Sequence, residues 1–103
     1  MVKLIYTKPA ITDLKNIFHY ISIDSEFNAH HFTNQLRERV KTLKTYPEKG
    51  RPLFPDKFPG IRQVLFKSYR IIYEYTGSSV IIHVITHQSR LLSNIEAIKP
   101  YII

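Results

Sequence analysis

Three runs rich in β-branched and aromatic residues lie close together in the second half of the chain, and they constrain the fold more than any other feature. They span residues 62–66, 69–75 and 80–85. Such side chains fit the pleated, half-buried surface of a sheet. Gly77, after the second run, supplies the positive φ that a tight hairpin turn requires, and Lys67-Ser68 marks a shorter turn before it. The sequence therefore predicts a three-stranded antiparallel meander.

Two amphipathic segments precede the meander. Apolar residues recur at helical spacing over residues 9–23, and again over residues 28–45 at steps of three and four. Pro9 fits the first turn of a helix, because the N–H that it lacks would have no partner there. Ser25 and Asn28 are both candidate N-caps for the second helix. The short link between the two segments predicts an antiparallel helical hairpin.

The remaining segments are predicted from prolines and from short apolar runs. Residues 2–6 form a short strand candidate that joins the meander at an edge or pairs across it. Residues 47–60 hold four of the six prolines and are predicted to be a loop. Residues 91–98 are predicted to form a short helix that Pro100 ends, and the apolar tail 101–103 is expected to pack on the domain or on a partner.

The order of elements indicates the fold class. A strand and two helices followed by a run of strands is the α+β pattern. We expect a single domain over residues 1–103, because a chain of 103 residues has the length of one domain. The helical hairpin is expected to pack on one face of a small antiparallel sheet that ends in the meander. The other face is then expected to be open, concave and basic.

Composition narrows the classes of function. Fifteen Lys and Arg against eight Asp and Glu give a net charge of +7, which favours an acidic partner such as nucleic acid or an acidic protein segment. The chain has no Cys, which excludes disulfides, thiolate chemistry and zinc–thiolate sites. No apolar run approaches the ~18 residues that cross a membrane, and the N-terminus lacks a signal-peptide core. We therefore expect a cytoplasmic protein without a membrane partner.

One histidine and three arginines form the constellation with the clearest chemistry. Arg62 and Arg70 lie on the meander, and His87 and Arg90 lie at its end or just past it. Arginine holds phosphate through forked donors, and histidine transfers protons near neutral pH. If the four side chains converge, they supply the acid–base and electrostatic parts of an RNA cleavage site. The alternative is a sheet with one solvated face, on which such residues are common.

Other residues are predicted to contact a target. Tyr69 or Tyr73 has the ring needed to stack on a base. Strand alternation places Glu74 on the face of Arg70, where we expect it to pair with that arginine. No metalloprotease, Walker A or dinucleotide motif occurs, so no metal and no nucleotide cofactor are expected. The full set of predicted target contacts is Arg51, Lys57, Lys67, Tyr69 and Tyr73.

Five groups of residues follow one another along the chain at characteristic distances. They are Pro9-Ala10 with Asp13-Leu14, Ile17 and Tyr20-Ile21, then Pro47-Glu48-Lys49-Gly50-Arg51-Pro52, Gly60-Ile61-Arg62, Tyr69-Arg70-Ile71-Ile72-Tyr73 and His87-Gln88-Ser89-Arg90. In this order they resemble the RelE/ParE superfamily of toxins from bacterial type II toxin–antitoxin systems, over nearly the whole chain. The likeness is greatest to the ParE-like branch, although Leu91 stands where that branch often has Asp.

The resemblance implies a growth-inhibiting toxin that a cognate antitoxin silences in a hetero-oligomer by wrapping its surface. It also implies one of two activities. ParE-like members poison DNA gyrase without breaking a bond themselves, whereas RelE-like members cleave mRNA on the ribosome without a metal. In the second case Arg62, Arg70, His87 and Arg90 would be the catalytic residues.

Two departures from the ribonuclease pattern decide between these activities. Gln88 stands where some ribonucleases of the superfamily place a catalytic Tyr after the His, and the proline-rich segment offers no obvious acidic base. We therefore expect inhibition of DNA gyrase. The alternatives are the ribosome-dependent mRNA endoribonuclease and a toxin-like remnant that only binds its antitoxin.

Overall fold

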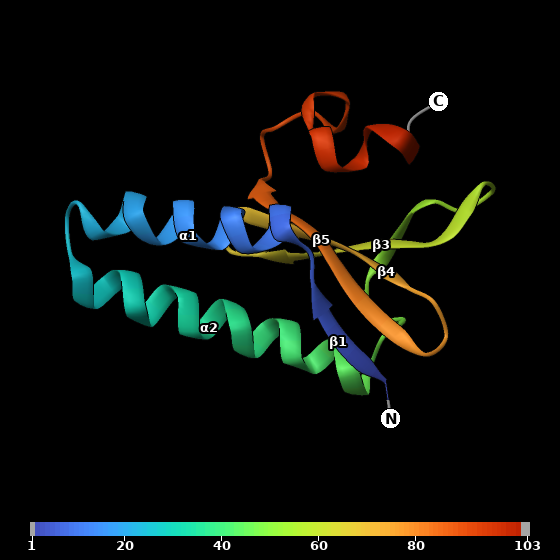
Figure 1. The fold of residues 1–103 in the computed structure, drawn as a ribbon, viewed down its shortest axis with the longest axis horizontal. Coiled ribbons are helices and arrows are strands. Elements are labelled where there is room, and N and C mark those ends of the chain that lie inside the picture. The colour runs from blue at the N-terminus through green and yellow to red at the C-terminus, as the bar shows by residue number, and fades with distance from the viewer. Residues whose placement is uncertain (1, 102–103) are drawn as a thin grey trace.

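Residues 2–101, the part of the chain that the computed structural model describes, form a five-stranded sheet with a helical hairpin on one face and two short 3₁₀ helices on the other (Figure 1). This arrangement confirms the predicted α+β fold. The elements in chain order are β1 (Lys3–Tyr6), α1 (Lys8–Ser22), α2 (Glu26–Thr45), β2 (Arg51–Phe54), β3 (Phe58–Phe66), β4 (Tyr69–Tyr75), β5 (Ser79–His87), η1 (Leu92–Asn94) and η2 (Glu96–Tyr101).

The helical hairpin begins where the sequence provides caps. The side-chain oxygen of Thr7 accepts the N–H of Ala10 at 3.2 Å, so Thr7 caps α1. Ser25, rather than Asn28, caps α2 by accepting the N–H of Asn28 at 3.1 Å. Both helices bury their apolar stripes, and the buried aliphatic side chains are Ala10, Leu14 and Ile17 on α1 and Ala29, Leu36, Val40 and Leu43 on α2.

The strand order across the sheet is β1-β5-β4-β3-β2. The neighbours from β2 to β5 are antiparallel, which confirms the predicted meander. The first strand lies at an edge of the sheet, which is one of the two positions predicted for it, and it runs parallel to β5. That direction follows from the helical hairpin, which carries the chain from β1 across the sheet before the meander begins.

The prediction that residues 47–60 form a loop is wrong. Part of this segment is β2, and β3 already begins at Phe58. Proline is tolerated here because β2 is an edge strand, in which a missing N–H removes no bond inside the sheet. The pairing of β2 with β3 also shifts register between Pro52 and Phe54, as an irregular edge strand permits.

The prediction that the second sheet face is open and basic is also wrong. Ile95 and Ile98, from the C-terminal segment, pack there on Ile61, Ile72 and Val84. The central strands are therefore buried on both faces, which explains the paired isoleucines of β4. The C-terminal segment thus acts as a third layer, which is visible in Figure 1 on the side of the sheet away from the helices.

The C-terminal segment differs in detail from the predicted short helix. It forms two 3₁₀ helices, and Pro100 lies inside the second one instead of ending a helix before it. Of the predicted packing tail, Tyr101 lies with its ring centre 5.0 Å from that of Phe58. Residues 102–103 lie outside the described part of the chain. Within the described part, none of the helices combines the length and apolar character needed to cross a membrane.

Candidate target-contact site

Arg62 holds the segment that connects α2 to β2. Its Nη1 donates to the carbonyl oxygens of Glu48 and Gly50 at 3.1 and 2.7 Å. Its Nη2 lies 3.8 Å from the Glu48 carboxylate, and the Arg62 side chain is mostly buried. The guanidinium group therefore serves the fold of this segment. It is not free to hold a phosphate group.

Tyr73 holds the same segment from β4. Its hydroxyl donates to the carbonyl of Pro47 at 2.7 Å and accepts the N–H of Gly50 at 2.9 Å. The Tyr73 side chain is fully buried, and this burial raises the pKa of its hydroxyl, against smaller opposing effects of the Gly50 N–H and Arg62. The prediction that Tyr73 contacts a target is therefore wrong.

Gly50 has a steric reason to be glycine. A Cβ atom there would lie 2.5 Å from the Tyr73 hydroxyl oxygen and 2.9 Å from the carbonyl oxygen of Gln63. The group 47–52 that resembles the toxin family is thus explained by packing, because its backbone is bonded to both Arg62 and Tyr73.

Arg70 binds the end of β5 and the turn beyond it. Its Nη2 donates to the carbonyls of Gln88 and Arg90 at 2.7 and 2.9 Å, and its Nη1 reaches the side chain of Gln63 at 3.4 Å. Arg70 therefore fastens the start of the C-terminal segment to the sheet. The predicted pair of Arg70 with Glu74 does not form, because the Glu74 carboxylate bonds to the His83 ring at 3.0 Å instead.

The four predicted catalytic residues do not form one site. Arg62 pairs across the strands with Tyr73, whose side chain faces the helices. Arg70 shares its face with Ile72, which packs under the C-terminal segment. The Arg90 side chain turns to the carbonyl of Asn94 at 3.0 Å. Arg62 and Arg70 thus lie on opposite faces of the sheet, and convergence with His87 and Arg90 is excluded. Whether any one of these four residues acts on a target by itself remains a prediction.

Two of the predicted contacts do meet, beside His87, at the end of the sheet where β3 turns into β4. The Tyr69 ring centre lies 5.7 Å from that of His87 and 5.6 Å from that of Phe32. The Lys67 ammonium group lies 5.3 Å from the centre of the Phe32 ring and bonds to the side chain of Gln35 at 3.0 Å. Cationic and aromatic side chains that lie together on a surface are typical of contact sites.

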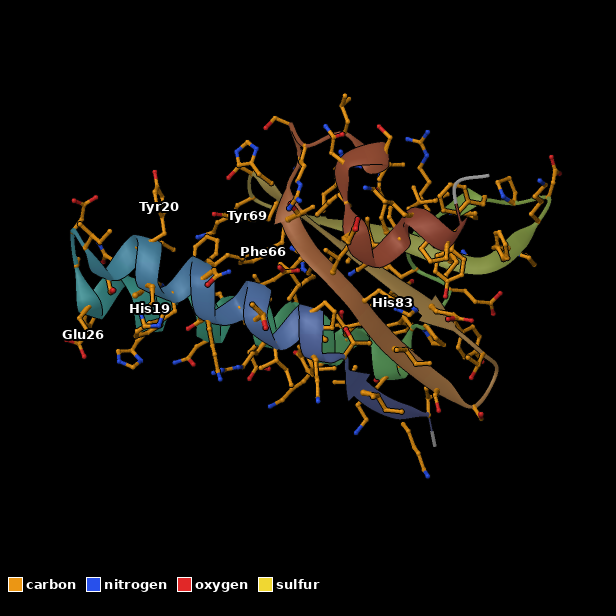
Figure 2. All side chains as sticks on the ribbon, turned by 45° about the horizontal axis from the view of Figure 1, so that its top comes forward. His19, Tyr20, Glu26, Phe66, Tyr69 and His83 are labelled. Atoms are coloured by element: carbon orange, nitrogen blue, oxygen red, sulfur yellow. The ribbon has the colours of Figure 1, made fainter. Side chains whose placement is uncertain are left out.

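Tyr20 belongs to the same region and was missed in the sequence. Burial raises the pKa of the Tyr69 hydroxyl, and the Tyr20 hydroxyl raises it further. Figure 2 shows Tyr20 standing out from α1 on the side of the helices where Tyr69 lies. A large exposed aromatic residue off the apolar stripe of α1 was the available signal. We call Tyr20, Lys67, Tyr69 and His87 the turn cluster.

The turn cluster is held in place by Gln88. Its side-chain amide donates to the carbonyl of Lys67 at 2.7 Å, and its backbone N–H donates to the carbonyl of Ser68 at 2.9 Å. Lys67 has a φ of 53°, which is unusual for a residue other than glycine. Gln88 therefore supports a strained turn in this chain.

His87 is exposed and has a fixed ring orientation. Its Nδ1 accepts the backbone N–H of Ser89 at 3.1 Å and lies 2.8 Å from the Ser89 hydroxyl oxygen. The proton of the neutral ring therefore sits on Nε2, which is the outer nitrogen. Within residues 2–101, no hydrogen bond or ion pair joins this ring to a carboxylate or an arginine side chain.

The other two predicted contacts lie elsewhere. Arg51 begins β2, Lys57 lies in the turn between β2 and β3, and both are exposed. Figure 1 places the β2–β3 hairpin at the end of the molecule opposite the tip of the helical hairpin. Neither residue therefore adds to the turn cluster. In the described part of the chain, no three His, Asp or Glu side chains are grouped as a metal site would require.

A hollow of about 340 Å³ lies between the two helices, beside the end of β1. Its lining is largely apolar and includes the cations Lys15 and Arg37, and none of the described residues that line it carries a carboxylate. We call this hollow the helix groove, and its lining residues are Tyr6, Ile11, Leu14, Lys15, Phe18, His19, Thr33 and Arg37. A groove with this lining has the size of a ligand pocket.

The fold has close relatives among solved structures. A chain of the chromosomal ParDE toxin–antitoxin system from P. aeruginosa superposes with a TM-score of 0.70, at 24% identity, over 84% of this chain and 96% of that one. A chain of the RelBE2 toxin–antitoxin complex from Mycobacterium tuberculosis superposes with a TM-score of 0.62, at 20% identity, over 84% and 98%. At these identities the likeness establishes the shared fold.

The sequence itself identifies the family. No curated protein matches the chain at a significant level. Residues 4–92, however, match the family described as the ParE toxin of the type II toxin–antitoxin system parDE. Because this match spans most of the sequence and includes the turn cluster, the chain belongs to the ParE toxin family, within the RelE/ParE superfamily of type II toxin–antitoxin toxins.

Proposed function

We propose that this ParE-family toxin arrests growth by binding DNA gyrase, and that it breaks no bond in its target. One observation carries the proposal: Arg62 and Arg70 lie on opposite faces of the sheet. A ribonuclease of this superfamily would need both guanidinium groups, with His87, around one phosphate. We therefore expect the contacts of this protein with its target to set the affinity of the complex and not the rate of a chemical step.

The bonds of Arg70 support this choice over mRNA cleavage. To hold a phosphate, Arg70 would have to leave the carbonyls of Gln88 and Arg90. The bond to the Gln88 carbonyl is partly buried, so a carbonyl left there without a donor costs up to about 1–3 kcal/mol, and the exposed bond to the Arg90 carbonyl contributes less. Within the described residues, no hydrogen bond or ion pair joins the His87 ring to a carboxylate or an arginine side chain, so proton transfer and charge stabilisation are not assembled around it.

The turn cluster is the proposed contact surface for the target. Its proposed contacts are the exposed Tyr20 and Lys67, with Tyr69 half-buried behind them, whereas His87 lies beside Tyr69 and is not itself one of the proposed contacts. Arg51 and Lys57 are proposed as more distant contacts. Aromatic and cationic side chains of this kind dominate the affinity of many interfaces.

The proposal is tested in cells by pulse labelling after induction. DNA and protein synthesis are followed separately for the wild type and for His87→Ala, with Ser89→Ala as the control for the ring orientation. We expect DNA synthesis to stop first, with nearly the same time course in all three strains. Immediate arrest of protein synthesis that His87→Ala abolishes would instead favour the ribonuclease, because loss of a positioned acid or base lowers a rate by ~10²–10⁴-fold.

A cognate antitoxin is the second part of the proposal. The solved relatives come from toxin–antitoxin assemblies, and this chain carries a net charge of +7. The helix groove offers an apolar lining with Lys15 and Arg37, and no carboxylate among residues 2–101 lines it. A flexible antitoxin segment with apolar and acidic side chains would fill it, in the manner of peptides that bind grooves. We expect the association rate to fall as salt rises, and to fall further in a Lys15→Glu, Arg37→Glu variant.

A further inference from the structure

Three large apolar side chains stand exposed around the connection between α1 and α2. Tyr20 is 72% exposed, Ile23 is 81% exposed and Phe27 is 78% exposed. We call these residues, with Asp24 and Glu26, the hairpin tip. Figure 1 shows that the connection lies at the end of the molecule away from the β2–β3 hairpin, and Figure 2 shows Tyr20 and Glu26 projecting there. Apolar side chains that gather on a surface mark interaction sites more often than scattered ones do.

The hairpin tip is an ordered knob. The backbone N–H groups of Asp24 and Ser25 both donate to the carbonyl of Ile21 at 3.1 Å, which fixes the connection. The cap formed by Ser25 fixes the start of α2. The Phe27 ring stacks on His31 with the ring centres 6.4 Å apart and the planes inclined by 7°. Because the knob is held in one shape before binding, little conformational entropy is lost when a partner covers it.

The charge of the tip favours a protein partner over a nucleic acid. Residues 16–36 contain no Lys or Arg, although the whole chain has fifteen, and they contain the carboxylates of Asp24 and Glu26. The affinity of a protein for phosphate groups comes mainly from Lys and Arg, so this surface disfavours DNA and RNA. The complementary surface is therefore apolar with a cationic edge, and it belongs to a protein.

The shape of the tip decides which protein. A convex knob needs a concave partner, whereas a flexible antitoxin segment needs a concave surface such as the helix groove. A second copy of this chain is also a poor partner, because two knobs are not complementary and three side chains cover far less than the ~800 Å² per partner of a stable interface. A folded protein with a hollow remains.

We infer that the hairpin tip inserts into an apolar hollow, edged by cationic side chains, on the folded protein that this toxin inhibits. The inference rests on the proposed function, because it takes the target to be a protein. It adds Ile23, Phe27, Asp24 and Glu26 to the surface by which this chain contacts its target. Tyr20 is the residue that the hairpin tip shares with the turn cluster.

The experiment compares Phe27→Asp and Ile23→Asp with wild type and with Tyr46→Asp. Tyr46 is 63% exposed at the other end of α2, so it controls for a carboxylate placed on an exposed apolar position. Growth arrest after induction is the first measurement, and the toxin concentration that half-inhibits purified DNA gyrase is the second. Both tip variants are expected to raise that concentration at least about 10-fold and to relieve growth arrest, as loss of an interface anchor does. Tyr46→Asp is expected to match wild type.

A charge series tests the cationic edge. Asp24→Lys with Glu26→Lys is expected to weaken inhibition more than Asp24→Asn with Glu26→Gln, because the first pair places like charges against the edge. Equal potency of the two double variants would show that the hollow has no cationic edge. Circular dichroism and the antitoxin complex are checked for every variant, so that a folding defect is recognised directly.

Each outcome separates this inference from the proposed function. If wild type leaves gyrase untouched, the proposed target is wrong, yet the growth comparison still tests the tip. If the tip variants arrest growth like wild type, the inference is overturned. Loss of the antitoxin complex in Phe27→Asp would make the tip an antitoxin surface, and a change in molecular mass would make it a contact between copies, and both results overturn the inference.

Discussion

The Tyr73 hydroxyl offers the sharpest test of how this fold is held together. In Tyr73→Phe the ring stays and only the oxygen is lost, so no cavity of consequence forms. The change removes the acceptor for the buried N–H of Gly50 and the donor to the carbonyl of Pro47. A buried N–H without a partner costs about 1–3 kcal/mol, and the second bond contributes about 1 kcal/mol more.

The free energy of unfolding should therefore fall by about 2–4 kcal/mol. Urea unfolding followed by circular dichroism measures it, and the slope with urea should stay the same because the unfolded chain exposes the same surface. Tyr75→Phe is the matched control, since the Tyr75 hydroxyl makes one long, exposed bond of 3.5 Å to the carbonyl of Gly77. That control should change stability by less than about 0.5 kcal/mol.

A Tyr73→Phe variant as stable as the Tyr75→Phe control would refute this account of the segment after α2. Gly50→Ala provides an independent check on the same contact. Its added Cβ would meet the Tyr73 hydroxyl at 2.5 Å, so it should also be destabilising.

Three further predictions concern other contacts. Leu36→Ala should lower the free energy of unfolding by about 2–5 kcal/mol in urea, because Leu36 is fully buried. Arg70→Ala should speed hydrogen exchange in residues 88–101, because it frees two carbonyls that fasten that segment; unchanged exchange would refute this. Burial raises the pKa of the Asp13 carboxyl, although the Ile85 N–H and Arg90 act to lower it. The contribution of this group to stability is therefore present below the ordinary carboxyl pKa and is lost as pH rises through the raised value. Asp13→Asn should therefore gain stability relative to wild type as pH rises from about 4, which urea midpoints measured across pH would show.

Much of the fold follows from local patterns in the sequence. The apolar steps of the helices predicted their bounds to within a few residues, because both stripes are regular and both N-termini carry a hydroxyl cap. The meander followed from β-branched runs and from Gly77, whose φ of 94° confirms the expected turn. These features depend on neighbours along the chain, which a sequence displays directly.

The errors arose where distant segments decide the structure. Edge position makes proline acceptable in β2, but no residue of 47–60 reveals which strand becomes an edge. The cover over the second sheet face comes from Ile95 and Ile98, whose short segment carries too weak a periodicity to predict its packing. The Glu74 carboxylate bonds to His83 rather than to Arg70. The register between β4 and β5 shifts nearby, after Ile72.

The separation of Arg62 and Arg70 was within reach of the sequence. A two-residue turn at Lys67-Ser68 places Phe66 opposite Tyr69, and counting back along the strands places Leu65 opposite Arg70. Residues 62 and 65 are three apart on one strand, so their side chains point to opposite faces. Tyr20 could be found only as an exposed aromatic residue, because its position near Tyr69 depends on how α1 packs on the sheet.

The most direct test of the proposed function is a supercoiling assay with purified DNA gyrase, in which wild type and His87→Ala are titrated side by side. We predict that both inhibit supercoiling at similar concentrations, because no proton has to move when the toxin acts by binding. Gyrase that stays fully active at a large excess of wild type, together with codon-phased cleavage of ribosome-bound mRNA that disappears in His87→Ala, would contradict it.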